Sequence, residues 1–63
     1  MAVLASDLAS AAQALEDVAL RVGKAASDQE AARREDLAQE LYELEAVLVR
    51  SARRLRRVVD SIS

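Results

Sequence analysis

The sequence predicts an all-α protein: an antiparallel helical hairpin, its second helix the longer, that dimerises into a four-helix bundle or antiparallel coiled coil. Three observations predict this fold. The 63 residues include one glycine and no proline, while 32% are charged and 52% hydrophobic, a composition typical of long helices. Apolar residues recur at alternating steps of four and three. The phase of this repeat changes between the two halves. A chain of this length holds one domain, residues 1–63.

The first helix is predicted over about 3–23. Its core positions a and d carry apolar residues, namely Leu4, Leu8, Ala11, Leu15, Val18, Val22 and Ala25. Position e, beside them, is alanine each time, at Ala5, Ala12, Ala19 and Ala26. A stripe over a, d and e is wide enough for a helix with two neighbours. We expect the alanines to let one neighbour approach closely.

The second helix is predicted over about 28–61. The same rhythm there runs through Leu37, Leu41, Leu44, Leu48, Ser51, Leu55, Val58 and Ile62, and these eight residues form the predicted dimer interface. The two repeats are out of phase by two residues, or five. An insertion of three or four residues would give a stammer or stutter within one helix, so this shift favours two helices instead.

Local signals place the turn at about 24–27. Gly23, the only glycine, suits the residue that follows a helix, and Lys24 follows it. The stretch "SDQE" from Ser27 to Glu30 matches a capping box, in which the serine and glutamate side chains satisfy free amides at a helix start. The alternative is that Gly23 lies within a helix and the turn is tighter, near 26–28.

These boundaries give helices of about 32 and 50 Å, so the end of the second helix lacks a partner within its own chain. The apolar residues on that end predict an interface. A second copy is the expected partner, running antiparallel and crossing near Leu48. This alignment sets Leu41 level with Leu55 of the other copy. It also sets the acidic first half of the second helix against the basic second half.

Five arginines lie between Val49 and Arg57, and four of them, Arg50, Arg53, Arg54 and Arg57, share one helical face. Such a face can bind phosphates of nucleic acid or an anionic membrane surface. It can equally be a hydrated face that pairs with the acidic half of a second copy. No aromatic residue is interleaved to stack on bases, which favours the last interpretation.

Three smaller groups of residues are also candidate sites: an outer apolar pair, two polar core positions and an acidic stripe. Tyr42 and Val49 are one heptad apart outside the core and form a possible outer docking patch. Ser51 at d and Arg34 at a are polar core positions that can set register. The carboxylates Asp36, Glu40 and Glu43 form an acidic stripe. Since their heptad positions point outward and the chain has no histidine, we interpret them as a hydrated face.

Composition excludes several classes of function. With no Cys and no His, the chain lacks thiolate and imidazole ligands and the commonest general base. We therefore expect no cofactor, no metal and no enzymatic activity. No apolar run reaches the ~20 residues of a transmembrane helix. The first ten residues lack the basic start of a secretory signal, so a cytoplasmic location is expected.

The predicted architecture and chain length resemble those of Rop, a plasmid copy-number regulator whose hairpins dimerise into a four-helix bundle and bind RNA. The resemblance implies the bundle, and no RNA-contacting residue is carried over from it. The leading expectation is a self-associating adaptor, scaffold or small regulator that acts through protein contacts, with itself and possibly another helical protein as partner. The alternatives are a nucleic-acid-binding dimer and peripheral membrane association through the C-terminal segment.

Overall fold

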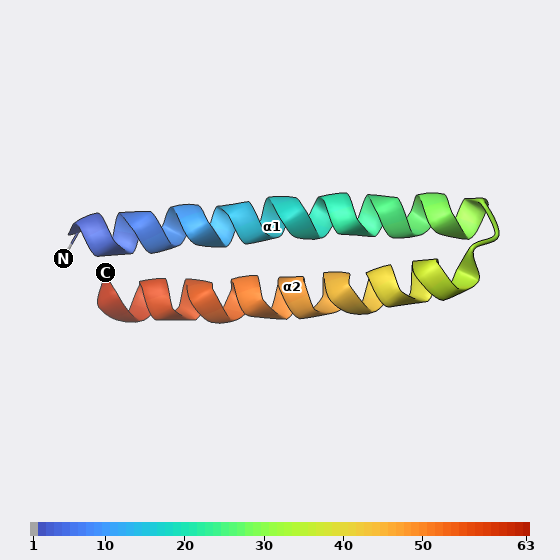
Figure 1. The fold of residues 1–63 in the computed structure, drawn as a ribbon. Helices are drawn as coiled ribbons and strands as arrows, with labels where there is room; N and C mark the ends of the chain where they lie inside the picture. The colour runs from blue at the N-terminus through green and yellow to red at the C-terminus, as the bar shows by residue number, and fades with distance from the viewer. Residues whose placement is uncertain (1) are drawn as a thin grey trace.

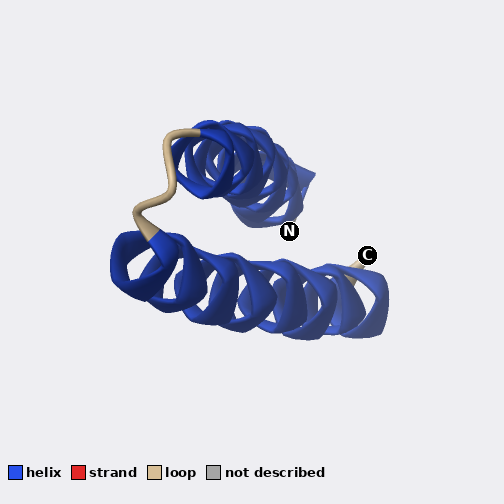
Figure 2. Ribbon diagram, turned by 90° about the vertical axis from the view of Figure 1, so that its right-hand side faces the viewer, coloured by secondary structure: helices blue, strands red, loops and turns tan. Residues whose placement is uncertain are grey.

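The structure is a computed structural model that describes residues 2–63, with side chains from Leu4 onward. It contains the helices α1, Ala2–Ala31, and α2, Glu35–Ile62. The helices lie side by side and antiparallel, joined at one end by residues 32–34, with both termini at the other end (Figure 1). Figure 2 views the pair from the end that carries the connection. The predicted all-α hairpin is confirmed.

Two side-chain contacts define the register of the hairpin. Glu16 of α1 accepts hydrogen bonds from Arg56 of α2, and Glu30 of α1 accepts one from Tyr42. These contacts are separated by equal lengths of helix in opposite directions. The pairing is therefore antiparallel along the whole of both helices.

The seam between the helices is made of alanine. Among the described side chains the buried apolar ones are all alanines: Ala12, Ala19 and Ala26 on α1, and Ala38 and Ala52 on α2. A methyl side chain takes little room and costs no side-chain entropy when it is ordered, so the two backbones can pack closely. The close approach expected from the alanine series of the first helix is confirmed.

The predicted turn at about 24–27 is wrong. Helix α1 continues through Gly23 and through Ser27 to Glu30 and ends at Ala31. The capping-box residues lie within the helix, where backbone amides already bond to carbonyls four residues back. Gly23 lies within α1, opposite a large side chain of α2 that is described below.

The actual turn is a Schellman motif without glycine. The Arg34 N–H donates to the Gln29 carbonyl at 2.8 Å, and the Arg33 N–H donates to the Glu30 carbonyl at 3.0 Å. This pattern requires a left-handed residue just past the helix, and Arg33 supplies it with φ 63°. An arginine at that position gives no sequence signal for a turn, because glycine or asparagine is usual there.

The helices have nearly equal lengths, 30 and 28 residues, in place of the predicted short first and long second helix. The predicted overhang is therefore absent. Ala52 is buried and Val59 half-buried near the end of α2, and Arg56 bonds to Glu16 there. Arg34, predicted at a core position, is exposed and directly precedes α2. Any interface with a second copy must use a face of the hairpin.

Candidate interaction surfaces

All the described leucines except Leu20 lie on the same face of the hairpin. At 100° per residue, Glu16 lies to one side of the seam residue Ala19 and Leu15 to the other. On α2, Arg56 lies to one side of the seam and Leu48 to the other. Because Glu16 bonds to Arg56, the two polar sides coincide. The two leucine sides must coincide as well.

We call this surface the leucine face. Its inner members are half-buried: Leu8, Leu15, Val22, Leu41, Leu48 and Leu55. Its outer members are exposed: Leu4, Val18, Leu37, Leu44, Val58 and Ile62. Leu4 and Leu44 expose 53% and 52% of their surface. Ser51 is exposed among them. All eight residues predicted for the dimer interface therefore lie on one surface that the hairpin leaves uncovered.

The opposite edge of the seam is polar. The Arg56 guanidinium donates two hydrogen bonds of 2.9 Å to the two carboxylate oxygens of Glu16 and a third, of 3.3 Å, to the Gln13 side chain. The hydrogen bond from Arg56 lowers the pKa of the Glu16 carboxyl below its ordinary value of 4.5. Arg56 thus bridges α2 to α1. It is the arginine of the cluster that sequence reasoning left out of the anion-binding stripe.

Tyr42 lies on the same edge, nearer the turn. Its hydroxyl donates to the Glu30 carboxylate at 3.1 Å. Partial desolvation raises the pKa of the phenol above its ordinary value of 10.0, and the hydrogen bond to Glu30 raises it further. The Tyr42 hydroxyl is therefore engaged within the hairpin. The docking patch of Tyr42 and Val49 stays a prediction.

A carboxylate interrupts the alanine seam. Glu45 occupies the heptad position between Ala38 and Ala52 and is half-buried. It lies against Gly23, where a built Cβ would stand 2.8 Å from the Glu45 Cδ and closer still to Oε2. The missing side chain of Gly23 makes the room that Glu45 needs. The only glycine of the chain therefore serves the packing of the two helices and does not end a helix.

Beside Glu45 the polar edge contains a hollow of about 270 Å³, which we call the outer hollow. Its lining residues are Glu16, Ala19, Leu20, Glu45 and Val49. Leu20 is 72% exposed, more than any other large apolar side chain described. The sequence predicted Val49 in an outer patch but did not predict Leu20 beside it, because only the register of the hairpin brings Leu20 and Val49 together.

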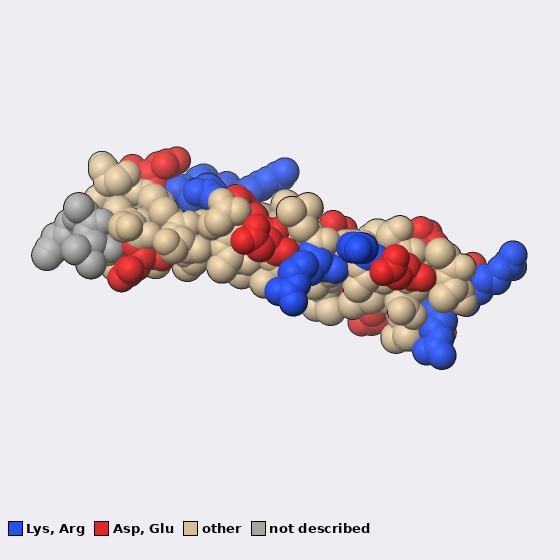
Figure 3. Space-filling model, turned by 90° about the horizontal axis from the view of Figure 1, so that it is seen from above, with Lys and Arg blue, Asp and Glu red and all other residues tan. Residues whose placement is uncertain are grey.

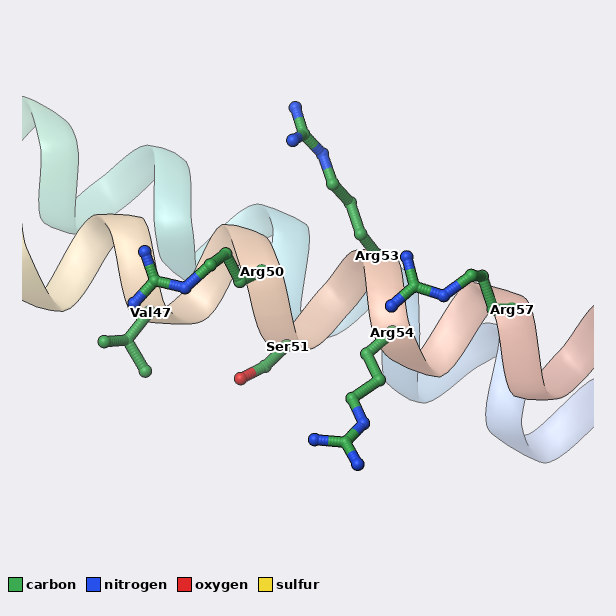
Figure 4. A pocket seen from close by; sticks show the side chains of 6 residues that line it. All are labelled: Val47, Arg50, Ser51, Arg53, Arg54 and Arg57. Atoms are coloured by element: carbon green, nitrogen blue, oxygen red, sulfur yellow. The ribbon is translucent and has the colours of Figure 1, made fainter.

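The four predicted arginines lie on the outer side of α2, away from α1. Arg50, Arg53, Arg54 and Arg57 line a shallow hollow with Val47 and Ser51. Figure 4 shows their guanidinium groups spread apart, with those of Arg53 and Arg54 extending to opposite sides of the helix. Among the described residues, Arg56 and Glu16 form an ion pair within 4.0 Å. None of the four arginines forms such a pair with a described residue. The hairpin leaves them without an acidic partner.

Acidic side chains are dispersed over the surface. Seen from above, Figure 3 shows acidic and basic groups interspersed with uncharged surface. The stripe Asp36, Glu40 and Glu43 is exposed on α2. Nowhere between residues 2 and 63 do three or more His, Cys, Asp or Glu side chains gather so that they could hold a metal ion.

Neither described helix has a stretch both long and apolar enough to cross a membrane. Comparison of the chain with protein-family models, with curated proteins and with solved structures finds no match. The function must therefore be argued from the surfaces themselves.

Proposed function

We propose that the chain is a non-enzymatic, self-associating helical module that works as an adaptor or small regulator through protein contacts. Two hairpins pair through their leucine faces in an antiparallel four-helix bundle, in which α2 of one copy packs on α2 of the other. The crossing point lies near Leu48.

The observation that carries this proposal is the absence of a large buried side chain. Among the side chains described, none larger than alanine is buried, while the leucines, valines and isoleucine of the leucine face are half-buried or exposed. Fully burying one such side chain stabilises a protein by roughly 1.5–3 kcal/mol. The isolated hairpin lacks part of that stabilisation, and pairing of two leucine faces would supply it.

The surface area supports the same conclusion. The chain exposes 4809 Å², whereas a compact monomer of this mass exposes about 4,000 Å². The surplus of roughly 800 Å² is what one partner buries in a protein–protein interface of standard size. A second copy covering the leucine face would bring the exposed area to the ordinary range.

The charge pattern of α2 favours a second copy as the partner. One heptad series beside the leucine face reads Glu40, Val47 and Arg54, with an acid, an apolar residue and a base in turn. An antiparallel second copy sets Glu40 near Arg54 of its partner on both sides of the twofold axis, and valine on valine at the centre. A parallel pair would instead place arginine against arginine.

A second series has the same symmetry. Asp36 and Glu43 are followed at the same spacing by Arg50 and Arg57. In the antiparallel alignment each acid lies level with an arginine of the other copy, within reach of its long side chain. Exposed ion pairs contribute only about 0.2–1 kcal/mol each. We therefore assign the choice of orientation to the charges and the affinity to the leucines.

Sedimentation equilibrium at low and high salt, with helicity followed by circular dichroism, tests the proposal. We expect a dimer at both salts. Leu48→Glu, which places two like charges near the twofold axis, should give a monomer with reduced helicity. The matched control is Leu20→Glu, on the opposite and exposed edge, which should remain dimeric. A wild-type monomer, or a dimer unaffected by Leu48→Glu, would refute the arrangement.

A nucleic-acid-binding dimer is the second candidate, because Arg50, Arg53, Arg54 and Arg57 find no acidic partner inside the hairpin. If all four bind phosphates of duplex DNA or RNA, log K should fall against log salt with a slope of about −3 to −4. Binding without that slope, or unchanged in a variant with glutamine at the four positions, would exclude this function.

A further inference from the structure

The outer hollow stays open in the proposed dimer. It lies on the polar edge of the seam, across from the leucine face, so each dimer would carry two copies of it on its outer surfaces. Its volume of about 270 Å³ is below the roughly 300–1,000 Å³ of sites that enclose a drug-sized ligand. It matches a single protruding side chain better than a small molecule.

The walls of the hollow are apolar and come from both helices. Leu20 and Ala19 belong to α1, and Val49 belongs to α2. Leu20 projects into solvent with 72% of its surface exposed. It belongs neither to the alanine seam nor to the leucine face. The aliphatic part of a partner's side chain, placed between Leu20 and Val49, would cover apolar surface that is exposed to solvent in both the hairpin and the proposed dimer.

The lining of the hollow also offers one free negative charge. Of its two carboxylates, Glu16 is already held by Arg56, and over the described residues no ion pair is formed by Glu45. Glu45 stands where the heptad series otherwise has alanine, in room made by Gly23. The Glu45 carboxylate is half-buried, has no cationic partner among the described residues and lies beside apolar walls. It is therefore complementary to a side chain that has an alkyl stem and a positively charged end group.

We propose that the outer hollow accepts an arginine side chain presented by an amphipathic helix of a partner protein. The stem packs on Leu20 and Val49, and the guanidinium pairs with Glu45, for which its planar fork is suited. Because the hollow lies along the groove between two antiparallel helices, a third helix laid in that groove extends the packing. This inference deepens the proposed adaptor function and rests on it, since it names the partner chemistry that the adaptor recognises.

The test uses the full chain and three synthetic alanine-based helical peptides. The first carries an arginine flanked by leucines one helical turn away on each side. The second has citrulline, a neutral isostere, in place of arginine, and the third has alanine in place of both leucines. Backbone amide shifts of the ¹⁵N-labelled chain report where each peptide binds, and a titration gives its affinity.

We expect the arginine peptide to shift the amides around Leu20, Glu45 and Val49. The citrulline peptide, and Glu45→Ala with the arginine peptide, should each bind at least about tenfold more weakly, the effect of losing one hydrogen-bonded charge pair. Glu45→Ala completes the alanine seam, so loss of binding in that variant does not arise from unfolding. Leu20→Gln should also weaken binding. Asp17→Asn, which removes a negative charge outside the hollow, should not.

Equal affinity for the arginine and citrulline peptides, or shifts confined to the leucine face, would overturn the inference. So would assembly of dimers into larger species that Leu20→Gln abolishes, because the occupant would then be another copy of the chain. Sedimentation separates this test from that of the proposed function. A dimer that ignores the peptide refutes the inference alone, and a monomer refutes the dimer whatever the peptide does.

Discussion

The contact between Gly23 and Glu45 makes a quantitative prediction about stability. Replacing a glycine by alanine in the middle of a helix ordinarily stabilises it by about 1 kcal/mol. At Gly23 the added methyl group would overlap the Glu45 carboxyl group, so the glutamate side chain must move. An off-rotamer shift of this kind costs about 0.5–1.5 kcal/mol. We therefore expect Gly23→Ala to be nearly neutral in the wild-type chain.

The same substitution should behave differently once Glu45 is gone. The atoms nearest to the built Cβ all belong to Glu45, and the third nearest is already at 3.4 Å, an ordinary contact distance. In the Glu45→Ala background, Gly23→Ala should therefore stabilise the chain by about 1 kcal/mol. Glu45→Ala alone should stabilise by a few tenths of a kcal/mol through helix propensity. The coupling between the two positions is expected to be about 1 kcal/mol.

Urea and thermal unfolding of the four chains of this cycle measure the coupling. All four must be compared at one protein concentration, because the stability of a dimer depends on it. A difference of 1 kcal/mol corresponds to roughly 4–8 °C in Tm for a chain of this size. The control is Ser10→Ala, on the exposed side of α1, which should add about 0.5 kcal/mol in both backgrounds. Equal stabilisation by Gly23→Ala with and without Glu45 would show that the two residues do not touch.

Three further predictions concern the charges and the turn. Arg54→Glu should weaken the dimer in sedimentation and Glu40→Arg should do the same, whereas the double variant should regain wild-type affinity; weakening that adds up in the double variant would refute the antiparallel pairing. Arg33→Gly should stabilise the chain by about 1 kcal/mol against urea, because glycine adopts the left-handed φ of 63° without steric cost. Since the pKa of Glu16 is lowered in the folded chain, its contribution is fully present above pH 4.5 and is lost as the pH falls through the folded value; E16Q should flatten the stability profile in that acidic range.

Much of the candidate interface was predictable because it depends on periodicity alone. The spacing of the leucines assigns them to one stripe of each helix whatever the turn does, so the predicted members from Leu37 to Ile62 lie together as expected. The alanine series of α1 likewise predicted a close neighbour before that neighbour was known. The outer hollow was not predictable, because Leu20 and Val49 come together only when the register of the hairpin is set.

The sequence by itself determined that the chain forms two amphipathic helices with a break between them, since a phase shift of two or five residues is neither the stammer nor the stutter that one continuous helix accommodates. Only the tertiary structure decided where the break falls. Gly23 and Ser27 carry local signals for helix ends, but these are worth about a kcal/mol each. Packing of the alanine seam over the full length of both helices outweighs them, and moves the turn to Arg33, where no local signal marks it. The partner of Arg56 and the room for Glu45 follow from that register, because both depend on which residues of α1 and α2 lie opposite each other.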